Sequence, residues 1–141
     1  MIIGRGSNLQ KMRNYITNND LNDTIKIKKF TDNPFPYMRL ANAFVLSSTF
    51  EGLPNVLLES LVLKRFIISS NCQTGPREIL LNGKGGLLFN VGNHTQLSKK
   101  ILFLSTNRKQ CNKMLSLAIK NLDRFDESLN LNKYLKLINN I

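Results

Sequence analysis

Short apolar segments with strand character alternate with segments of helical periodicity along most of this chain. The apolar segments lie at residues 1–4, 25–30, 43–47, 66–69 and 86–89. Between them, apolar residues recur at the three- and four-residue spacing of one helix face. This alternation predicts an α/β protein built on a doubly wound parallel sheet, because parallel strands need a crossover helix between them.

The helical segments set the expected organisation of the chain. At 141 residues, the chain has the length of one domain. We expect an α/β core over about residues 1–106 and C-terminal helices over residues 107–141. Helices are predicted at residues 8–17, around Met38 and Leu40, at 54–63, at 76–80, and from His94 onward with breaks near Asn107 and Asp126.

The charge balance is the unusual feature of the composition. Twenty Lys and Arg against nine Asp and Glu give a net charge of +11, which attracts polyanions. A solvated basic surface is the simpler interpretation. Without a zinc-finger or RNA-binding aromatic motif, we expect no nucleic-acid partner. The anionic inner face of the cell membrane is a candidate partner surface.

Cysteine usage and hydropathy favour a cytoplasmic location. Cys72 and Cys111 lie far apart with no paired spacing, so we expect neither a disulfide framework nor a zinc site. No apolar run approaches the ~20 residues of a membrane span. The N-terminal residues do not have the pattern of a secretory signal.

The turn that follows residues 43–47 has features of an anion site. Pro54 suits the first helical position, because its missing N–H would have no partner there. Gly52 allows a ligand to approach the backbone closely. The next N–H groups, of Asn55, Val56 and Leu57, would then point into the crevice at the strand ends, where the helix dipole favours an anion. An ordinary helix start is the alternative for this turn taken alone.

The turn after the next strand repeats this design. Pro76 again suits the first helical position, Gly75 precedes it, and Glu78 lies at the capping-box position. Consecutive parallel βα units place both helix starts at the same edge of the sheet. With Arg77 nearby, the two helix starts together predict a diphosphate site.

Two carboxylates are associated with the first of these turns. Glu59 lies in an apolar helix that we expect to be largely buried, where a carboxylate needs partners. It shares a helix face with Asn55, one turn earlier, and that face points toward the crevice. Glu51 lies in the turn itself. The pair would bracket one ligand that carries hydroxyl groups, although a solvent-facing Glu59 is the alternative.

At these residues the chain resembles glycosyltransferase family 4, whose members are retaining enzymes of the GT-B fold. The similarity extends from residue 2 to the terminal helix. The matching blocks are I-I-G-R-G at 2–6, N-P-F-P-Y at 33–37, E-G-L-P-N-V-L-L-E at 51–59, N-C-Q-T-G-P-R-E-I-L at 71–80 and G-G-L-L-F at 85–89. The two glutamates separated by seven residues are the most specific element of the resemblance.

The resemblance implies a role for each matching residue in binding a nucleotide sugar. Glu51 would contact donor-sugar hydroxyls near the reacting face, which makes it the catalytic candidate. Glu59 would accept hydrogen bonds from the ribose hydroxyls. Backbone N–H groups of Leu53, Asn55 and Val56 would bind the sugar and the diphosphate, and Leu57 would pack nearby. The segment at Phe30 and Thr31 would hold the base. No metal or other cofactor is implied, because helix dipoles and basic side chains neutralise the leaving diphosphate.

The chain also departs from the family pattern. The first strand of the donor domain, its loop with an Arg and a Lys, and the whole N-terminal acceptor domain have no counterpart in residues 1–141. We therefore expect a partial GT-B domain that lacks a central strand. The expected function is that of a hexosyltransferase fragment which binds a UDP-sugar for bacterial surface polysaccharide, lipopolysaccharide or glycolipid synthesis. A non-catalytic nucleotide-sugar-binding module, or an inactive remnant, is the alternative.

Overall fold

The computed structural model describes residues 1–139 and divides the chain into two compact units, one over Met1–Pro36 and one that begins at Tyr37. All strand pairs are parallel, which confirms the α/β class. The strands form two sheets, with the orders β1-β2 and β3-β4-β5. The last two positions of the expected C-terminal helical segment, Asn140 and Ile141, lie outside the described residues.

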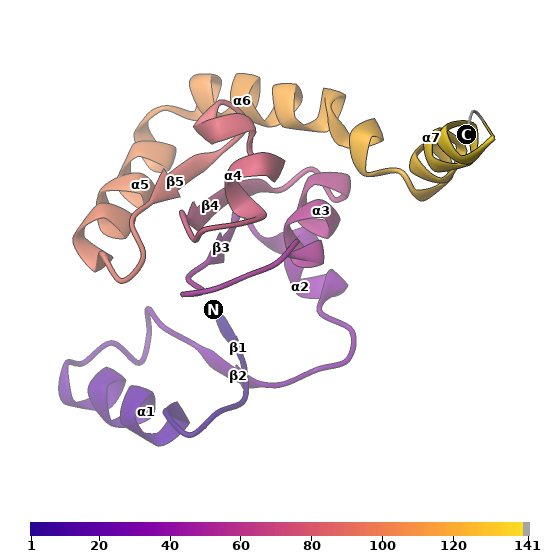
Figure 1. Cartoon of the computed structure of the whole chain (residues 1–141). Coiled ribbons are helices and arrows are strands. Elements are labelled where there is room, and N and C mark those ends of the chain that lie inside the picture. The colour runs from indigo at the N-terminus through magenta and orange to yellow at the C-terminus, as the bar shows by residue number, and fades with distance from the viewer. Residues whose placement is uncertain (140–141) are drawn as a thin grey trace. The chain divides into compact units, whose positions relative to one another are not determined.

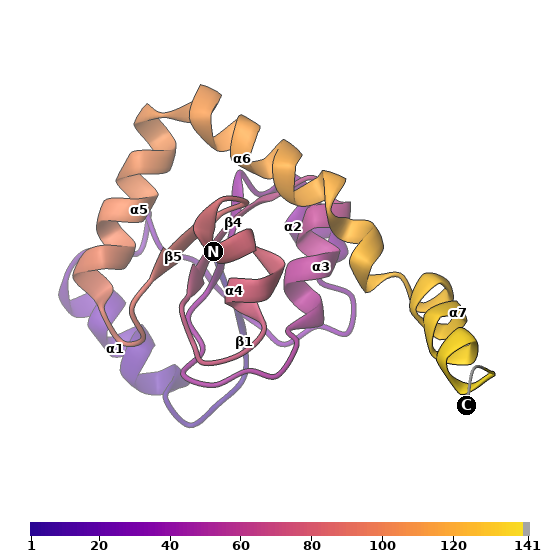
Figure 2. The ribbon, with the colours of Figure 1, turned by 45° about the horizontal axis from the view of Figure 1, so that its top comes forward.

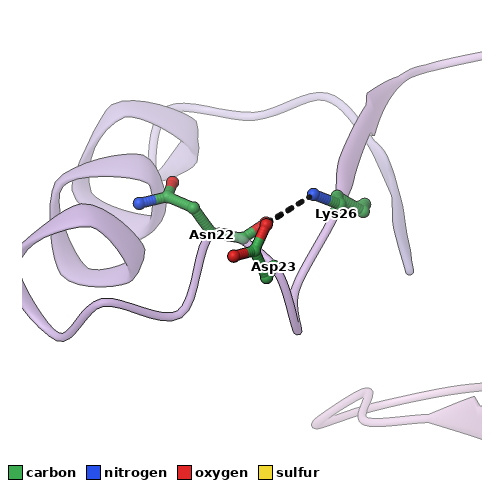
Figure 3. Close-up of polar contacts among 3 residues, drawn as sticks. All are labelled: Asn22, Asp23 and Lys26. Atoms are coloured by element: carbon green, nitrogen blue, oxygen red, sulfur yellow. Dashed lines mark hydrogen bonds and ion pairs between the residues drawn. The ribbon is translucent and has the colours of Figure 1, made fainter.

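The first unit is a single βαβ element. Strand β1 (Ile2–Gly4) pairs with β2 (Ile27–Lys29), and Ile2 lies opposite Ile27. Helix α1 (Leu9–Asn18) connects them and buries Ile16. Strand β2 is shorter than the predicted segment, because the preceding residues form a turn. There Lys26 Nζ donates a hydrogen bond to the Asn22 carbonyl at 2.6 Å and lies 3.9 Å from Asp23 Oδ1 (Figure 3).

The second unit is organised around β4 (Phe66–Ser70), whose five residues are all buried. It lies between β3 (Ala43–Leu46) and β5 (Leu87–Phe89) (Figure 1). The edge strand β3 is only half-buried, in contrast to the predicted buried strand. The other elements are α2 (Phe35–Leu40), α3 (Asn55–Val62), α4 (Pro76–Ile79), the 3₁₀ turn η1 (Leu81–Gly83), α5 (His94–Thr106), α6 (Arg108–Lys120), the 3₁₀ turn η2 (Leu122–Phe125) and α7 (Glu127–Ile138).

Alternate residues of β4 pack into two hydrophobic clusters. Ile67 packs with Leu57 and Leu61 of α3, together with the last residues of α4. Phe66 and Ile68 belong to a second cluster, which also contains Leu87 and Phe89 of β5, Leu104 of α5 and Cys111 of α6. Because neighbouring strand residues point to opposite faces, helices cover both faces of this sheet, as expected for a doubly wound fold.

Helix α6 lies across the amino ends of the strands (Figures 1 and 2). Its residue Cys111 shares a cluster with Phe66, which begins β4. Its residue Ala118 contacts Gly85, which precedes β5, and a Cβ on that glycine would lie 2.8 Å from the Ala118 Cβ. The opposite end of the sheet, where the strands finish, is therefore free of α6.

The C-terminal helices begin close to their predicted positions. Asn93 accepts a hydrogen bond from the Gln96 N–H at the start of α5, and α6 begins directly after Asn107. Asp126 accepts one from the Leu129 N–H and so caps α7. No helix within residues 1–139 is long and apolar enough to cross a bilayer.

Candidate functional site

The candidate site is formed by the two loops that leave the carboxyl ends of β3 and β4. Residues 47–54 follow β3, and residues 71–75 follow β4. The two strands are paired along their length, with Leu46 opposite Ser69, so the loops leave the sheet side by side. This confirms that the two turns share one edge, the edge at which open α/β sheets bind ligands.

Gly75 brings the two loops into contact. Its φ of +78° and ψ of −71° lie in a region that residues with a side chain rarely adopt. A Cβ at this position would overlap the carbonyl oxygen of Gly52 and the ring of Pro54. Only glycine therefore allows the second loop to approach the first this closely.

Two hydroxyl groups hold the backbone of the first loop. Ser70, fully buried at the end of β4, donates a hydrogen bond to the carbonyl of Ser48 at 2.6 Å. Thr74 Oγ1 in the second loop donates one to the carbonyl of Glu51. Together with the contact at Gly75, these bonds fix the path of the first loop on both sides of its turn.

The carboxylate of Glu51 is oriented within this loop. Ser48 Oγ donates a hydrogen bond to Glu51 Oε1 at 2.6 Å. No residue of the described chain donates to the other oxygen, Oε2. Glu51 is partly buried, so one oxygen is held by the protein while the other can accept a hydrogen bond from a ligand.

The start of α3 differs from the prediction by one residue. Pro54 is the N-cap with an extended ψ of 96°, and the helix begins at Asn55. The Leu57 N–H donates to the Pro54 carbonyl at 2.9 Å and so is not free, contrary to the expectation. The N–H groups of Asn55 and Val56 have no partner in the described chain. They make the amino end of α3 suitable for an anion.

The residues between Glu51 and the helix are open to solvent. Gly52 is exposed, and a Cβ there would meet no atom within 4 Å. Leu53 is 47% exposed. A ligand at this edge could therefore reach the backbone of both residues.

Glu59 is half-buried rather than largely buried, which corrects the expectation. Helix α3 buries Leu57, Ser60 and Leu61 on one face, whereas Val62 is 68% exposed. Since α3 covers the sheet with only one face, the carboxylate of Glu59 is not forced to find a protein partner. No side chain of residues 1–139 bonds to it, so it is available to accept hydrogen bonds from hydroxyl groups.

Arg77 supplies a positive charge at the same edge. Its Nε donates a hydrogen bond to Asn71 Oδ1 at 3.0 Å, which anchors the guanidinium to the second loop. The predicted capping role of Glu78 is wrong: its side chain is exposed and makes no cap hydrogen bond. A capping box needs a Ser or Thr at the N-cap, and that position is Gly75.

The predicted base-binding residues belong to the first unit. Phe30 is 51% exposed, and the guanidinium of Arg5 lies 4.7 Å from its ring centroid. The hydroxyl of Thr31 accepts a hydrogen bond from the Asn33 N–H at 3.3 Å. Both residues are described within that unit alone.

The sequence interpretation did not single out Ser48, Ser70 or Thr74. Their hydroxyl groups act between loops, and such contacts depend on tertiary structure rather than on local spacing. The available signal was the occurrence of hydroxyl residues in both turns, at 47–49 and at 69, 70 and 74. Residues 1–139 contain no group of three His, Cys, Asp or Glu that could hold a metal ion.

The parallel βα units and the polar edge at which their loops meet define a Rossmann-like ligand-binding domain. The fold matches the Rossmann-like domains of GT-B glycosyltransferases. The model of the family glycosyl transferases group 1 matches residues 1–121, and the chain belongs to this family.

Individual relatives agree with this assignment. The chain is 40% identical over 80 residues to an uncharacterized glycosyltransferase of Methanocaldococcus jannaschii, which covers 57% of the chain and 20% of that protein. It is 30% identical over 95 residues to the lipopolysaccharide 1,6-galactosyltransferase of Salmonella typhimurium, covering 64% and 26% respectively.

A solved structure gives the same result over almost the whole chain. The structure of Staphylococcus aureus TarM in complex with fondaparinux, α-GlcNAc-glycerol and UDP superimposes with a TM-score of 0.84 at 26% identity. The match covers 98% of this chain and 28% of TarM. The chain thus spans between 20% and 28% of the length of these three proteins.

Proposed function

We propose that this chain is the donor-binding domain of a retaining, family 4 glycosyltransferase that uses a UDP-sugar. The observation that carries the proposal is the arrangement of Glu51. One carboxylate oxygen is held by Ser48 and the other is free, close in sequence to the two free N–H groups of α3. A nucleotide sugar combines the hydroxyl groups and the diphosphate that these groups would bind. The binding of UDP by TarM supports the choice of nucleotide.

Each group has a defined chemical role in this proposal. Glu51 Oε2 accepts hydrogen bonds from the donor sugar beside the carbon at which the bond to the diphosphate breaks. The N–H groups of Asn55 and Val56 and the amino end of α3 bind the diphosphate. Arg77 adds a fixed positive charge as the leaving group becomes more negative, which lowers the barrier to bond breaking. Glu59 accepts hydrogen bonds from the ribose hydroxyls.

Leu53 and Gly52 complete the proposed donor contacts. Leu53 offers its backbone N–H to the sugar, and Gly52 leaves room for it beside the loop. Leu57 has no direct contact with the donor in this proposal, because it is fully buried and its N–H is already bonded to Pro54. Phe30 and Thr31 remain the proposed contacts to the base.

The likely acceptor class follows from the relatives rather than from the site, so it is proposed on that ground alone. Similarity to a lipopolysaccharide 1,6-galactosyltransferase supports a role in surface polysaccharide, lipopolysaccharide or glycolipid synthesis. The chain spans about a quarter of that relative. This favours the second candidate, a nucleotide-sugar-binding module that does not transfer sugar by itself.

We further propose that the intact protein contributes a strand and an acceptor-binding domain in addition to these 141 residues. The usual doubly wound sheet has six strands in one sheet. Here five strands are divided between a two-stranded and a three-stranded sheet, which supports a missing strand. The DNA sequence upstream of the Met1 codon tests this: an in-frame continuation with α/β periodicity supports it, and a stop codon directly upstream contradicts it.

Titration of UDP and of several UDP-sugars against the chain tests the donor proposal. Glu59→Ala should weaken both ligands, because the ribose is common to both. Glu51→Ala should leave UDP binding unchanged and weaken the UDP-sugar. Glu78→Ala removes an exposed carboxylate outside the proposed contacts and serves as the matched control. Absence of UDP binding by the folded wild-type chain, or equal losses for both ligands in Glu51→Ala, would contradict the assignment.

A further inference from the structure

A long segment of the second unit carries positive charge without any negative charge. Between Glu78 and Asp123 the sequence contains no Asp or Glu. The same segment contains seven cations. They are Lys84, Lys99, Lys100, Arg108, Lys109, Lys113 and Lys120. The excess of basic residues over the whole chain is therefore concentrated in the region that contains α5 and α6.

Three of these cations form a stripe along the exposed side of α6. We call Lys109, Lys113 and Lys120 the α6 lysine stripe. At 3.6 residues per turn these positions lie within about 40° of one another, on the side opposite the buried residues Cys111 and Ala118. The stripe is about 16 Å long, given a rise of 1.5 Å per residue. It lines a shallow hollow together with Asn112, Ser116 and Leu117.

No carboxylate compensates the charge of the stripe. None of its three lysines forms an ion pair with any residue of the described chain, and all three are exposed. Arg108 extends the positive region at the amino end of the helix, where it lines a second hollow with Lys109 and Lys113. The side chain of Asn107 does not cap α6, so the positive end of the helix dipole adds to the same potential.

We propose that the α6 lysine stripe docks the protein on an anionic lipid bilayer. A straight, one-sided row of cations matches a flat anionic surface, and each lysine near such a surface strengthens binding about fivefold, the equivalent of about 1 kcal/mol. Leu117, 40% exposed beside the stripe, can enter the interfacial region between the lysine stems. Duplex nucleic acid would instead favour an element that enters a groove and reads base edges.

The position of α6 makes this docking compatible with ligand binding elsewhere in the unit. The helix crosses the amino ends of β4 and β5, whereas the loops of residues 47–54 and 71–75 leave the carboxyl ends of the strands (Figure 2). The docking surface and the candidate donor site therefore lie at opposite ends of the sheet. The inference is independent of the proposed function, and either can fail without the other.

Co-sedimentation with lipid vesicles tests the inference. The probes are phosphatidylcholine vesicles that contain phosphatidylglycerol, and vesicles of phosphatidylcholine alone, each at low and at high salt. The test variant is Lys109→Gln/Lys113→Gln/Lys120→Gln. The matched control, Lys11→Gln/Lys133→Gln/Lys136→Gln, lowers the net charge equally at exposed positions on α1 and α7. Circular dichroism and the UDP titration confirm that both variants keep their fold.

The expected result is salt-sensitive binding of the wild-type chain to the anionic vesicles only. The stripe variant should lose at least about tenfold in affinity, given about fivefold per lysine, while the control keeps most of it. Equal losses in the two variants would show that net charge alone drives binding and would overturn the inference. Equal binding to neutral vesicles would overturn it as well. So would duplex DNA that binds more tightly than the vesicles through the same three lysines.

Discussion

The Cα of Gly75 lies directly against the carbonyl oxygen of Gly52, so that even a methyl side chain on Gly75 would overlap this oxygen. These two glycines belong to different loops, which follow β4 and β3. Their contact makes the loops one structural unit at the edge of the sheet. The carboxylate of Glu51 lies in this unit, so its position depends on a residue 24 positions later in the chain.

Gly75→Ala is expected to destabilise the protein and to disturb the loop that carries Glu51. The positive φ costs about 1–2 kcal/mol for a residue with a Cβ, and the overlap adds about 1–3 kcal/mol. The free energy of unfolding from urea denaturation measures the loss. Titration of a UDP-sugar measures the effect on the site.

Gly92→Ala separates the two contributions. Gly92 also has a positive φ, of +74°, but a Cβ there would meet no atom within 4 Å. Its substitution should cost only the backbone term of about 1 kcal/mol and leave ligand binding unchanged. If the two alanine variants lose the same stability, close packing of the loops is not what requires glycine at position 75.

Ser48→Ala is expected to weaken the UDP-sugar more than UDP. The variant removes the hydrogen bond to Glu51 Oε1, so the carboxylate can leave the orientation that the sugar requires. The loss should correspond to the ~0.5–1.5 kcal/mol of a typical hydrogen bond, or roughly twofold to tenfold in affinity. Calorimetric titration of both ligands measures it. Ser47→Ala, at an exposed neighbouring hydroxyl, is the control and should bind both ligands as the wild type does. Equal weakening of UDP by Ser48→Ala would argue against orientation of Glu51.

The sequence predicts the helices better than it predicts the site. The break at Asn107 and the caps Asn93 and Asp126 are local signals, because a cap bonds to the helix it begins. The order of strands and helices is likewise a matter of periodicity. For these features the structure differs from the sequence interpretation by only one or two residues.

The contacts that orient the site residues are not local, and the sequence could not predict them. The hydrogen bond from Ser70 to Ser48 joins residues 22 positions apart, and the bond from Thr74 to Glu51 joins residues 23 apart. The burial of Glu59 was overestimated for a related reason. An apolar helix sequence does not show how much of the helix surface the rest of the protein covers, and α3 leaves Val62 exposed.

Leu61→Ala should destabilise the second unit far more than Val62→Ala, although the residues are adjacent. Leu61 is 1% exposed within the cluster around Ile67, and its truncation should cost about 2–5 kcal/mol. Val62 is 68% exposed and should cost less than about 0.5 kcal/mol. Chemical denaturation measures both values. Similar losses in the two variants would contradict the orientation of α3.

Cys111 should make the protein less stable at alkaline pH. Burial raises the pKa of the Cys111 thiol, and nearby Arg108 only partly opposes this effect. Above about pH 8.5 the unfolded chain releases this proton while the folded chain retains it, so stability falls as the pH rises. The Cys111→Ala variant lacks this contribution. Its free energy of unfolding, measured from pH 7 to 10, should fall less steeply than that of the wild type, and identical slopes would contradict burial of the thiol.

Arg124 gives the end of α4 a fixed position. Its guanidinium donates a hydrogen bond to the Glu78 carbonyl at 2.7 Å and a weaker one to the Ile79 carbonyl at 3.4 Å. The other end of the same short helix begins at Gly75, which contacts the loop of Glu51. A saturation-mutagenesis screen that scores only donor binding would therefore select Arg124 along with the ligand contacts, although this residue belongs to the C-terminal helical segment. Mapping functional sites by such screens would extend the apparent binding site of this protein well beyond the residues that reach the donor.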